Sequence, residues 1–168
     1  MNKEKLKQHL ISDTTRLFCV LDGASVPKLP MQLHNMQAAN VCLFKGDLEP
    51  DMLYVAPYVV YLPPDEKFTE WVLNESFGKQ WGIFVHSRRS MQEMRRHFRS
   101  LVNVYDEEAN SLIFRFYDPR VLNRFLPTCD ADQLKTFFGD VDTFFAEDGQ
   151  KLSSFQLENG RLKKKELE

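Results

Sequence analysis

Short apolar runs alternate with amphipathic segments along the whole chain, and this alternation is the feature that most restricts its fold. The runs are short for helices, and Gly, Pro or Asp residues close most of them, which is typical of β-strands. The predicted strands are residues 17–21, 41–44, 58–62, 81–86, 112–117 and 141–146. Strands that alternate with helices over short connections predict an α+β or α/β fold. We expect one compact domain over residues 1–168, with a mixed sheet flanked by helices; a division into two lobes stays open.

The segments between the runs carry helix signals. Ser90 with Glu93, and Asp130 with Gln133, have the spacing of capping boxes, in which two residues satisfy each other's backbone N–H groups at a helix start. Further helices are predicted over residues 1–12, 26–36, 50–57 and 68–77.

Residues 149–168 carry a hairpin signal. Asn159-Gly160, between alternating residues, favours a tight turn between antiparallel strands. Lys163-Lys164-Lys165 follows, and we predict a frayed, solvated end there. The segment is therefore predicted to be a hairpin and a charged tail.

Composition and charge exclude several classes of protein. The net charge is −2, so neither nucleic acid nor an anionic membrane is an expected partner. The first residues lack the apolar core of a signal peptide, and no apolar run approaches the ~20 residues of a membrane span, so we expect a cytoplasmic protein. The three cysteines lack metal-ligand spacing, and we expect no metal and no cofactor.

A cysteine–histidine pair is the catalytic arrangement to weigh. Cys19 and Cys42 lie in apolar runs, where cysteine acts as a small apolar residue, and His86 ends another run. No nucleophile elbow, phosphate loop or HExxH pattern is present. Structural roles are favoured for all three residues. A small hydrolase or transferase that uses a Cys/His or acid/base pair stays open as the alternative.

An arginine-rich face is predicted on the helix that follows Ser90. Arg95 and Arg99 lie four residues apart, opposite an apolar stripe that includes Met94 and Phe98. Guanidinium groups suit carboxylates, phosphates and protein interfaces. Two interpretations remain: a solvated helix face, or a surface that captures a partner by charge complementarity. A nucleic-acid partner is disfavoured by the acidic net charge.

The run from Phe114 to Val121 joins a predicted strand to a predicted helix. Asp118 can accept backbone N–H bonds as a helix cap, and Pro119 fits the first helical position. Arg115 lies between two phenylalanines in the predicted strand, so its charge needs a partner. Asp22, at the end of the first predicted strand, is the candidate carboxylate.

Four short motifs occur in order along the chain. They are Leu21-Asp22-Gly23-Ala24, Ala56-Pro57-Tyr58-Val59-Val60-Tyr61-Leu62, Trp81-Gly82-Ile83-Phe84-Val85-His86-Ser87 and Phe114-Arg115-Phe116-Tyr117-Asp118-Pro119-Arg120-Val121-Leu122. Together, over about residues 16–148, they resemble the domain-of-unknown-function family 4123, whose members are type VI secretion adaptors, also called effector chaperones. The resemblance implies binding to a cognate toxic effector and to the carboxy-terminal region of the spike protein. It implies no catalysis and no cofactor.

Two groups of site residues follow from the motifs and the arginine face. Those expected to contact a partner are Tyr117, Arg120, Arg95 and Arg99. Those expected to serve the fold and the motif structure are Asp22, Gly23, Trp81, Arg115, Asp118 and Pro119. The resemblance brings no catalytic residues with it.

Overall fold

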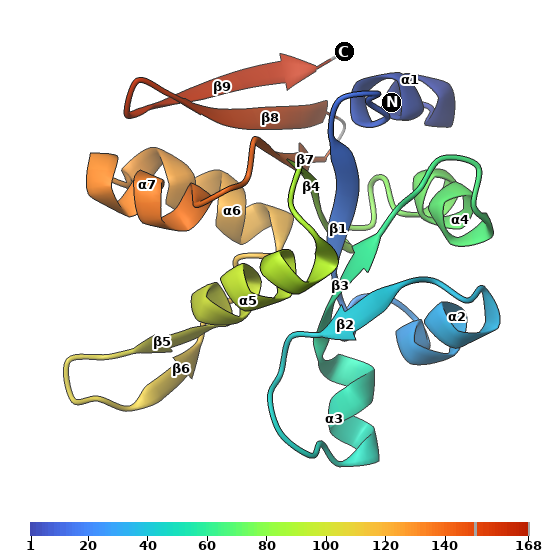
Figure 1. The fold of residues 1–168 in the computed structure, drawn as a ribbon, viewed down its shortest axis with the longest axis horizontal. Helices are drawn as coiled ribbons and strands as arrows, with labels where there is room; N and C mark the ends of the chain where they lie inside the picture. Colours follow the sequence, from blue (N-terminus) through green and yellow to red (C-terminus); the bar gives the residue numbers. More distant parts are fainter. Residues whose placement is uncertain (150, 168) are drawn as a thin grey trace.

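The computed structural model describes residues 1–149 and 151–167, and its main element is a seven-stranded sheet in the order β2-β3-β1-β4-β7-β8-β9 (Figure 1). The strands are β1 (Arg16–Asp22), β2 (Asn40–Cys42), β3 (Pro57–Tyr61), β4 (Gly82–Ser87), β7 (Thr143–Asp148), β8 (Lys151–Glu158) and β9 (Arg161–Leu167). The helices are α1 (Lys3–Leu10), α2 (Leu29–Asn35), α3 (Pro50–Val55), α4 (Lys67–Glu75), α5 (Met91–Val102), α6 (Pro119–Phe125) and α7 (Ala131–Phe138). A separate hairpin consists of β5 (Asn103–Tyr105) and β6 (Ser111–Ile113).

The α+β class and the single domain are confirmed, but the sheet is not mixed. Every pairing between described strands is antiparallel. β1 and β2 run in the same direction, with α2 between them in the chain, but they are not neighbours in the sheet. Instead β3 lies between them and pairs with both. Strand directions consequently alternate across the whole sheet.

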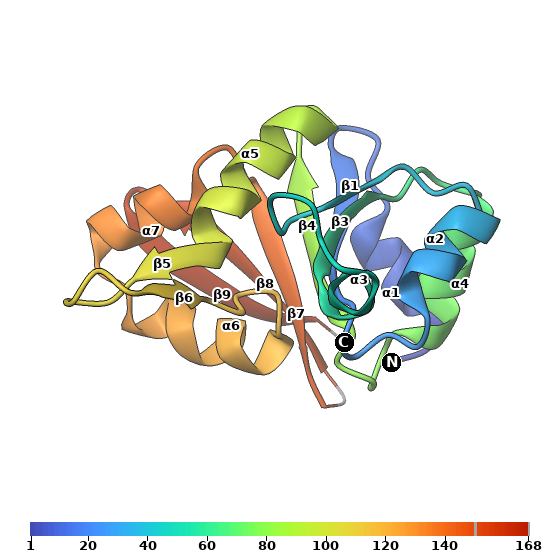
Figure 2. The same cartoon turned by 90° about the horizontal axis from the view of Figure 1, so that it is seen from below.

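Helices cover both faces of the sheet (Figures 1 and 2). One core lies under α5, α6 and α7, and the other lies under α1, α2 and α4. Along β1, Phe18 and Val20 enter the first core, whereas Cys19 and Leu21 enter the second. Because successive side chains of a strand point to opposite faces, a continuous apolar run is buried on both. α3 belongs to neither layer, since none of its residues is buried.

The helix starts form where the sequence predicted them. Ser90 with Glu93, and Asp130 with Gln133, make complete capping boxes at α5 and α7. These bonds satisfy backbone N–H groups that have no partner within the helix.

The strand expected over residues 112–117 is wrong. Only Ser111–Ile113 is extended, and it pairs with β5 outside the main sheet. After Phe114 the chain turns inward, which buries Phe116 and Tyr117 against the helices of the first core. Burial of two large aromatic side chains outweighs continuation of a strand that has no free sheet edge beside it.

The carboxy-terminal hairpin forms at Asn159-Gly160, where both residues have positive φ angles. The frayed end expected at Lys163-Lys164-Lys165 is wrong, because these residues lie within β9. They are exposed on the outermost strand, where lysines discourage pairing with another chain. Lys163 also pairs with Glu158 across the turn, at 2.9 Å.

Candidate functional site

Asp22 stands at the end of β1 and ties three segments together. Its side chain is only 3% exposed. It accepts hydrogen bonds from the Ala24 N–H and the Ser25 hydroxyl, both at 3.0 Å, which close the turn after the strand. The Arg115 Nη2 group donates to Asp22 Oδ2 at 2.5 Å. The structure therefore pairs Arg115 with the carboxylate that the sequence suggested.

Arg115 is less buried than its place between phenylalanines suggested. Its side chain is 46% exposed, because the segment after Phe114 turns and leaves the guanidinium at the surface. Burial lowers the pKa of Arg115, but the bond to Asp22 and its charge outweigh this, so the pKa is raised. The pair is thus asymmetric: a buried carboxylate is neutralised by a half-exposed cation.

A second such pair joins Asp118 to Arg120. Asp118 is 6% exposed and caps α6 by accepting from the Arg120 N–H at 2.9 Å, and Pro119 fills the next position. The Arg120 guanidinium donates to both Asp118 oxygens, through Nε at 3.0 Å and Nη2 at 2.7 Å. Burial raises the pKa of Asp118, but the bonds from Arg120 overcome this and lower it. Arg120, expected to contact a partner, is held by its neighbour, and its side chain is still 58% exposed.

These four residues, Asp22, Arg115, Asp118 and Arg120, form what we call the aspartate corner. Arg115 Nη2 lies 4.0 Å from Asp118 Oδ2, so the two pairs are adjacent. The corner joins β1 to the start of α6 across a long stretch of chain.

Gly23 and Trp81 fix the backbone on either side of Asp22 in the aspartate corner. A Cβ atom on Gly23 would lie 2.5 Å from the Ala56 carbonyl oxygen, so only glycine fits there. The Trp81 carbonyl accepts the Asp22 N–H at 2.8 Å, and its buried ring packs on Trp71. Both residues therefore serve the fold, in line with their expected roles.

Tyr117 does not lie on the surface. Its side chain is 2% exposed and packs against Phe116 in the first core. Burial raises its pKa to about 12, and the charge of Asp22 adds to the effect. A side chain this deeply buried offers almost no surface to a partner, so Tyr117 serves the core.

The arginine face of α5 divides into two kinds of residue. Arg99 is half-buried and donates through Nη2 to the carbonyls of Cys42, at 2.9 Å, and Phe44, at 3.4 Å. It therefore ties α5 to the end of β2. Arg95 and Arg96 are exposed, and neither forms an ion pair with any described carboxylate.

A hollow of about 360 Å³ lies over this face, between α5 and the loop that leads to α3. We call it the arginine hollow; it is lined by Lys45, Gln92, Arg95, Arg96, Arg99 and Ser100. Four of its residues are cationic. Glu93, the nearest acidic residue on the helix, is occupied by the capping box and by Arg89.

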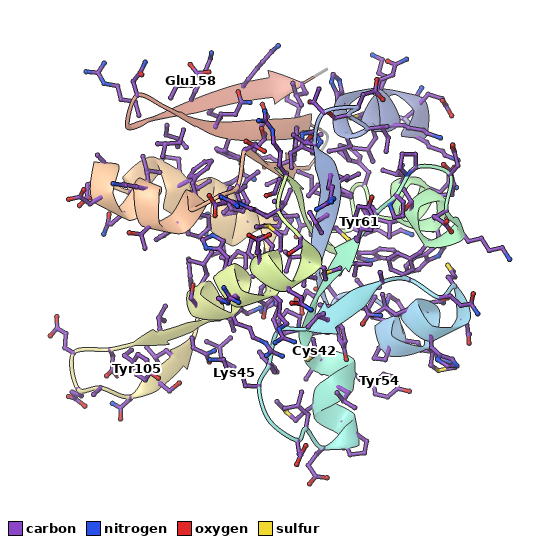
Figure 3. The ribbon with its side chains drawn as sticks, in the orientation of Figure 1. Cys42, Lys45, Tyr54, Tyr61, Tyr105 and Glu158 are labelled. Atoms are coloured by element: carbon purple, nitrogen blue, oxygen red, sulfur yellow. The ribbon has the colours of Figure 1, made fainter. Side chains whose placement is uncertain are left out.

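Exposed apolar side chains gather on α3 and on the β5–β6 hairpin. Both elements extend from the lower side of the molecule in Figure 1, and Figure 3 shows Tyr54 and Tyr105 on them with Lys45 between. The exposed apolar residues there are Met52, Leu53, Tyr54, Val55, Val104, Tyr105, Leu112 and Ile113. Tyr105 is 70% exposed. We call these eight residues the apolar face; so large a group of exposed apolar side chains is typical of an interaction site.

A family model described as "Domain of unknown function (DUF4123)" matches residues 17–136. The chain belongs to this family. The DUF4123 match contains the aspartate corner, the arginine hollow and the apolar face, and it ends before β7. No curated protein and no solved structure matches the chain.

The DUF4123 chain offers no support for the cysteine–histidine alternative. Cys19 is fully buried and burial raises its pKa; burial also raises the pKa of Cys42. A thiol with a raised pKa is a poor nucleophile. The His86 ring bonds the Leu10 carbonyl at 2.6 Å, and no bond found among the described residues joins it to a cysteine.

Within residues 1–149 and 151–167, no group of three or more metal-ligating side chains comes together. No helix in that part of the chain is long and apolar enough to cross a membrane.

Sequence reasoning missed the apolar face. A signal for it existed in α3, where four consecutive apolar residues, 52–55, lie in a helix with no polar side to turn outward. A helix that is apolar on all sides is normally buried, so the exposure of α3 in the structure is what marks it as a candidate interaction surface.

Proposed function

We propose that this DUF4123 protein is a non-catalytic adaptor, or chaperone, of a type VI secretion system. In this role it binds a cognate toxic effector in the cytoplasm and helps to load it onto the carboxy-terminal region of the spike protein. The family membership and the four motifs support the proposal, because the resemblance implies this role.

The apolar face carries the proposal. Interfaces concentrate large apolar and aromatic residues in their centre, and Tyr and Arg are enriched there. α3 and the hairpin supply the apolar and aromatic groups, and the arginine hollow lies beside them. These side chains stay 37–70% exposed in the described chain, and a bound protein would cover the exposed part.

The absence of catalysis belongs to the same proposal. The raised pKa values of the Cys19 and Cys42 thiols and the backbone-bound His86 leave the Cys/His alternative without an activated group.

Co-expression tests the proposal. The protein would be co-purified with the effector and the spike region encoded beside it, and we expect a complex that survives gel filtration. Tyr105→Ser with Ile113→Ser should lose the complex, because both side chains leave the apolar face. Met31→Ser on α2 is the matched control, since Met31 is equally an exposed apolar residue but lies elsewhere. Retention of the effector by the hairpin variant, or its loss with Met31→Ser, would contradict the proposed surface.

A further inference from the structure

The arginine hollow carries positive charges that form no ion pair with any described carboxylate. Lys45, Arg95 and Arg96 form no ion pair among the described residues, and Arg99 bonds only to carbonyl oxygens. Four neighbouring cations repel one another. This accumulation of positive charge points to an anionic group supplied from outside.

The chain places this hollow between the two parts of the apolar face. α5 leads directly into β5, and Lys45 lies in the loop that leads to α3. Figure 3 shows the same order along the lower side of the molecule, with Lys45 between Tyr105 and Tyr54. A ligand that covers both apolar parts must therefore cross the hollow.

We propose that the occupant is an acidic segment of the effector, with carboxylates that enter the arginine hollow and apolar side chains on either side that pack on α3 and the hairpin. This inference rests on the proposed function and adds the chemistry of the bound segment. Arginine suits carboxylates because its planar group donates two parallel hydrogen bonds.

A nucleic acid fits the surroundings less well. The tip of the hairpin carries Asp106, Glu107 and Glu108, which would repel a polyanion that runs past the hollow. The apolar side chains on both sides of the hollow also favour a peptide over a phosphate backbone. A short run of carboxylates can enter the hollow without running past the acidic tip of the hairpin. Leucine-like residues on either side of that run would contact the apolar side chains.

Labelled synthetic peptides provide the probe. Three short peptides would share leucines at the same positions and carry glutamate, glutamine or lysine at the others, and a single-stranded DNA oligonucleotide would serve as a second polyanion. The intact protein would be titrated into each, with fluorescence anisotropy as the readout. We expect the glutamate peptide to bind at least about tenfold more tightly than the glutamine peptide at low salt, and the difference to shrink as salt screens the charges.

Two charge-matched variants decide where the peptide binds. Arg95→Glu with Arg96→Glu should reduce affinity for the glutamate peptide at least about tenfold, because both residues line the hollow. Arg161→Glu with Lys165→Glu makes the same change in net charge on β9, on the opposite side of the molecule, and should leave affinity nearly unchanged (Figure 1). Thermal melting of both variants checks that they are folded.

Three results would overturn the inference. They are equal losses in the two variants, which would show attraction by net charge alone; no preference for glutamate over glutamine; and DNA binding that is tighter than peptide binding and is lost with Arg95 and Arg96. If the effector still co-purifies with the Arg95/Arg96 variant, the adaptor role stands and the acidic chemistry is wrong. If the glutamate peptide binds in the hollow but no effector is captured, the acidic chemistry stands and the adaptor role fails.

Discussion

The aspartate corner and the arginine hollow place arginines in opposite circumstances. In the corner, Arg115 and Arg120 each meet a buried carboxylate, at 2.5 and 2.7 Å. In the hollow, Arg95 and Arg96 meet none among the described residues. All four side chains lie at the surface, so exposure alone does not separate them. What separates them is whether the fold places a carboxylate against the guanidinium group to neutralise its charge.

This difference assigns the two regions different work. Charges that are paired within the chain stabilise its fold, and removal of either partner leaves the other uncompensated. Charges left without a carboxylate add nothing favourable to the fold, although water solvates them, and they stay available to a partner. Substitutions in the aspartate corner are therefore expected to change stability, and substitutions in the arginine hollow are expected to change binding.

Removal of Asp22 should break the corner most severely. Asp22→Ala deletes the acceptor for Ala24, Ser25 and Arg115 at once. We expect the free energy of unfolding to fall by about 3 kcal/mol, which lowers the melting temperature by on the order of 10 °C. Chemical denaturation measures this change. A loss no greater than that of an exposed surface substitution would remove the distinction between the corner and the hollow.

The two corner arginines should differ from each other. Arg115→Ala leaves the buried Asp22 carboxylate without a cation, although Ala24 and Ser25 still donate to it, whereas Arg120→Ala leaves Asp118 with Arg115 at 4.0 Å. We expect Arg115→Ala to cost about 2 kcal/mol, less than for a fully buried pair because water reaches the guanidinium group, and Arg120→Ala to cost less than Arg115→Ala. A double-mutant cycle of Arg115→Ala with Asp22→Asn isolates the pair, and a coupling energy near zero would contradict its role.

The free energy of unfolding at acidic pH should depend on the Asp118 carboxylate. Its pKa in the folded protein is lowered, so its contribution is present above the pKa of the unfolded chain and is lost as pH falls through the folded value. The Asp118→Asn variant lacks this contribution. The difference in the free energy of unfolding between the parent and the variant should therefore narrow as pH falls below about 4. Glu147, whose pKa burial raises, acts in the opposite sense, but it is present in both proteins and cancels in the difference. A deficit that is constant with pH would show that the charge of Asp118 has no part.

The smallest expected changes in stability are those of two arginines in α5, which should differ from each other. Arg99→Ala removes two bonds to carbonyls of the β2 end and should cost about 1 kcal/mol. Arg95→Ala removes no internal bond and should change stability by less than about 0.5 kcal/mol. Parallel denaturation curves compare them. Equal losses would mean that the two residues, which look equivalent in the helical repeat, are also equivalent in the fold.

Features that depend on neighbouring residues were predicted well from the sequence. The capping boxes at Ser90 and Asp130 and the turn at Asn159-Gly160 follow from local hydrogen bonding and backbone preference, which adjacent residues carry in full. The link between Asp22 and Arg115 was also within reach, because a charge placed among aromatic residues calls for an opposite charge.

Features that depend on the assembled sheet were not predictable. The periodicity of residues 112–117 fits a strand, yet Phe116 and Tyr117 pack into a core that includes Phe18 and Val20 of β1, which lie far away in the sequence. The lysines of β9 look like a frayed end until β8 is placed beside them. The different roles of Arg95 and Arg99 depend on the carbonyls of Cys42 and Phe44, 57 and 55 residues away from Arg99, which no helical repeat reveals.

The β5–β6 hairpin carries one more consequence. It consists of two strands of three residues each, it stands outside the main sheet, and most of its side chains face water. A two-stranded ribbon of this kind is marginally stable, so its amide hydrogens should exchange with solvent through local opening, long before the seven-stranded sheet unfolds. A protein that binds to the hairpin would prevent this local opening. Slower amide exchange at residues 103–113 would therefore detect the complex without any label.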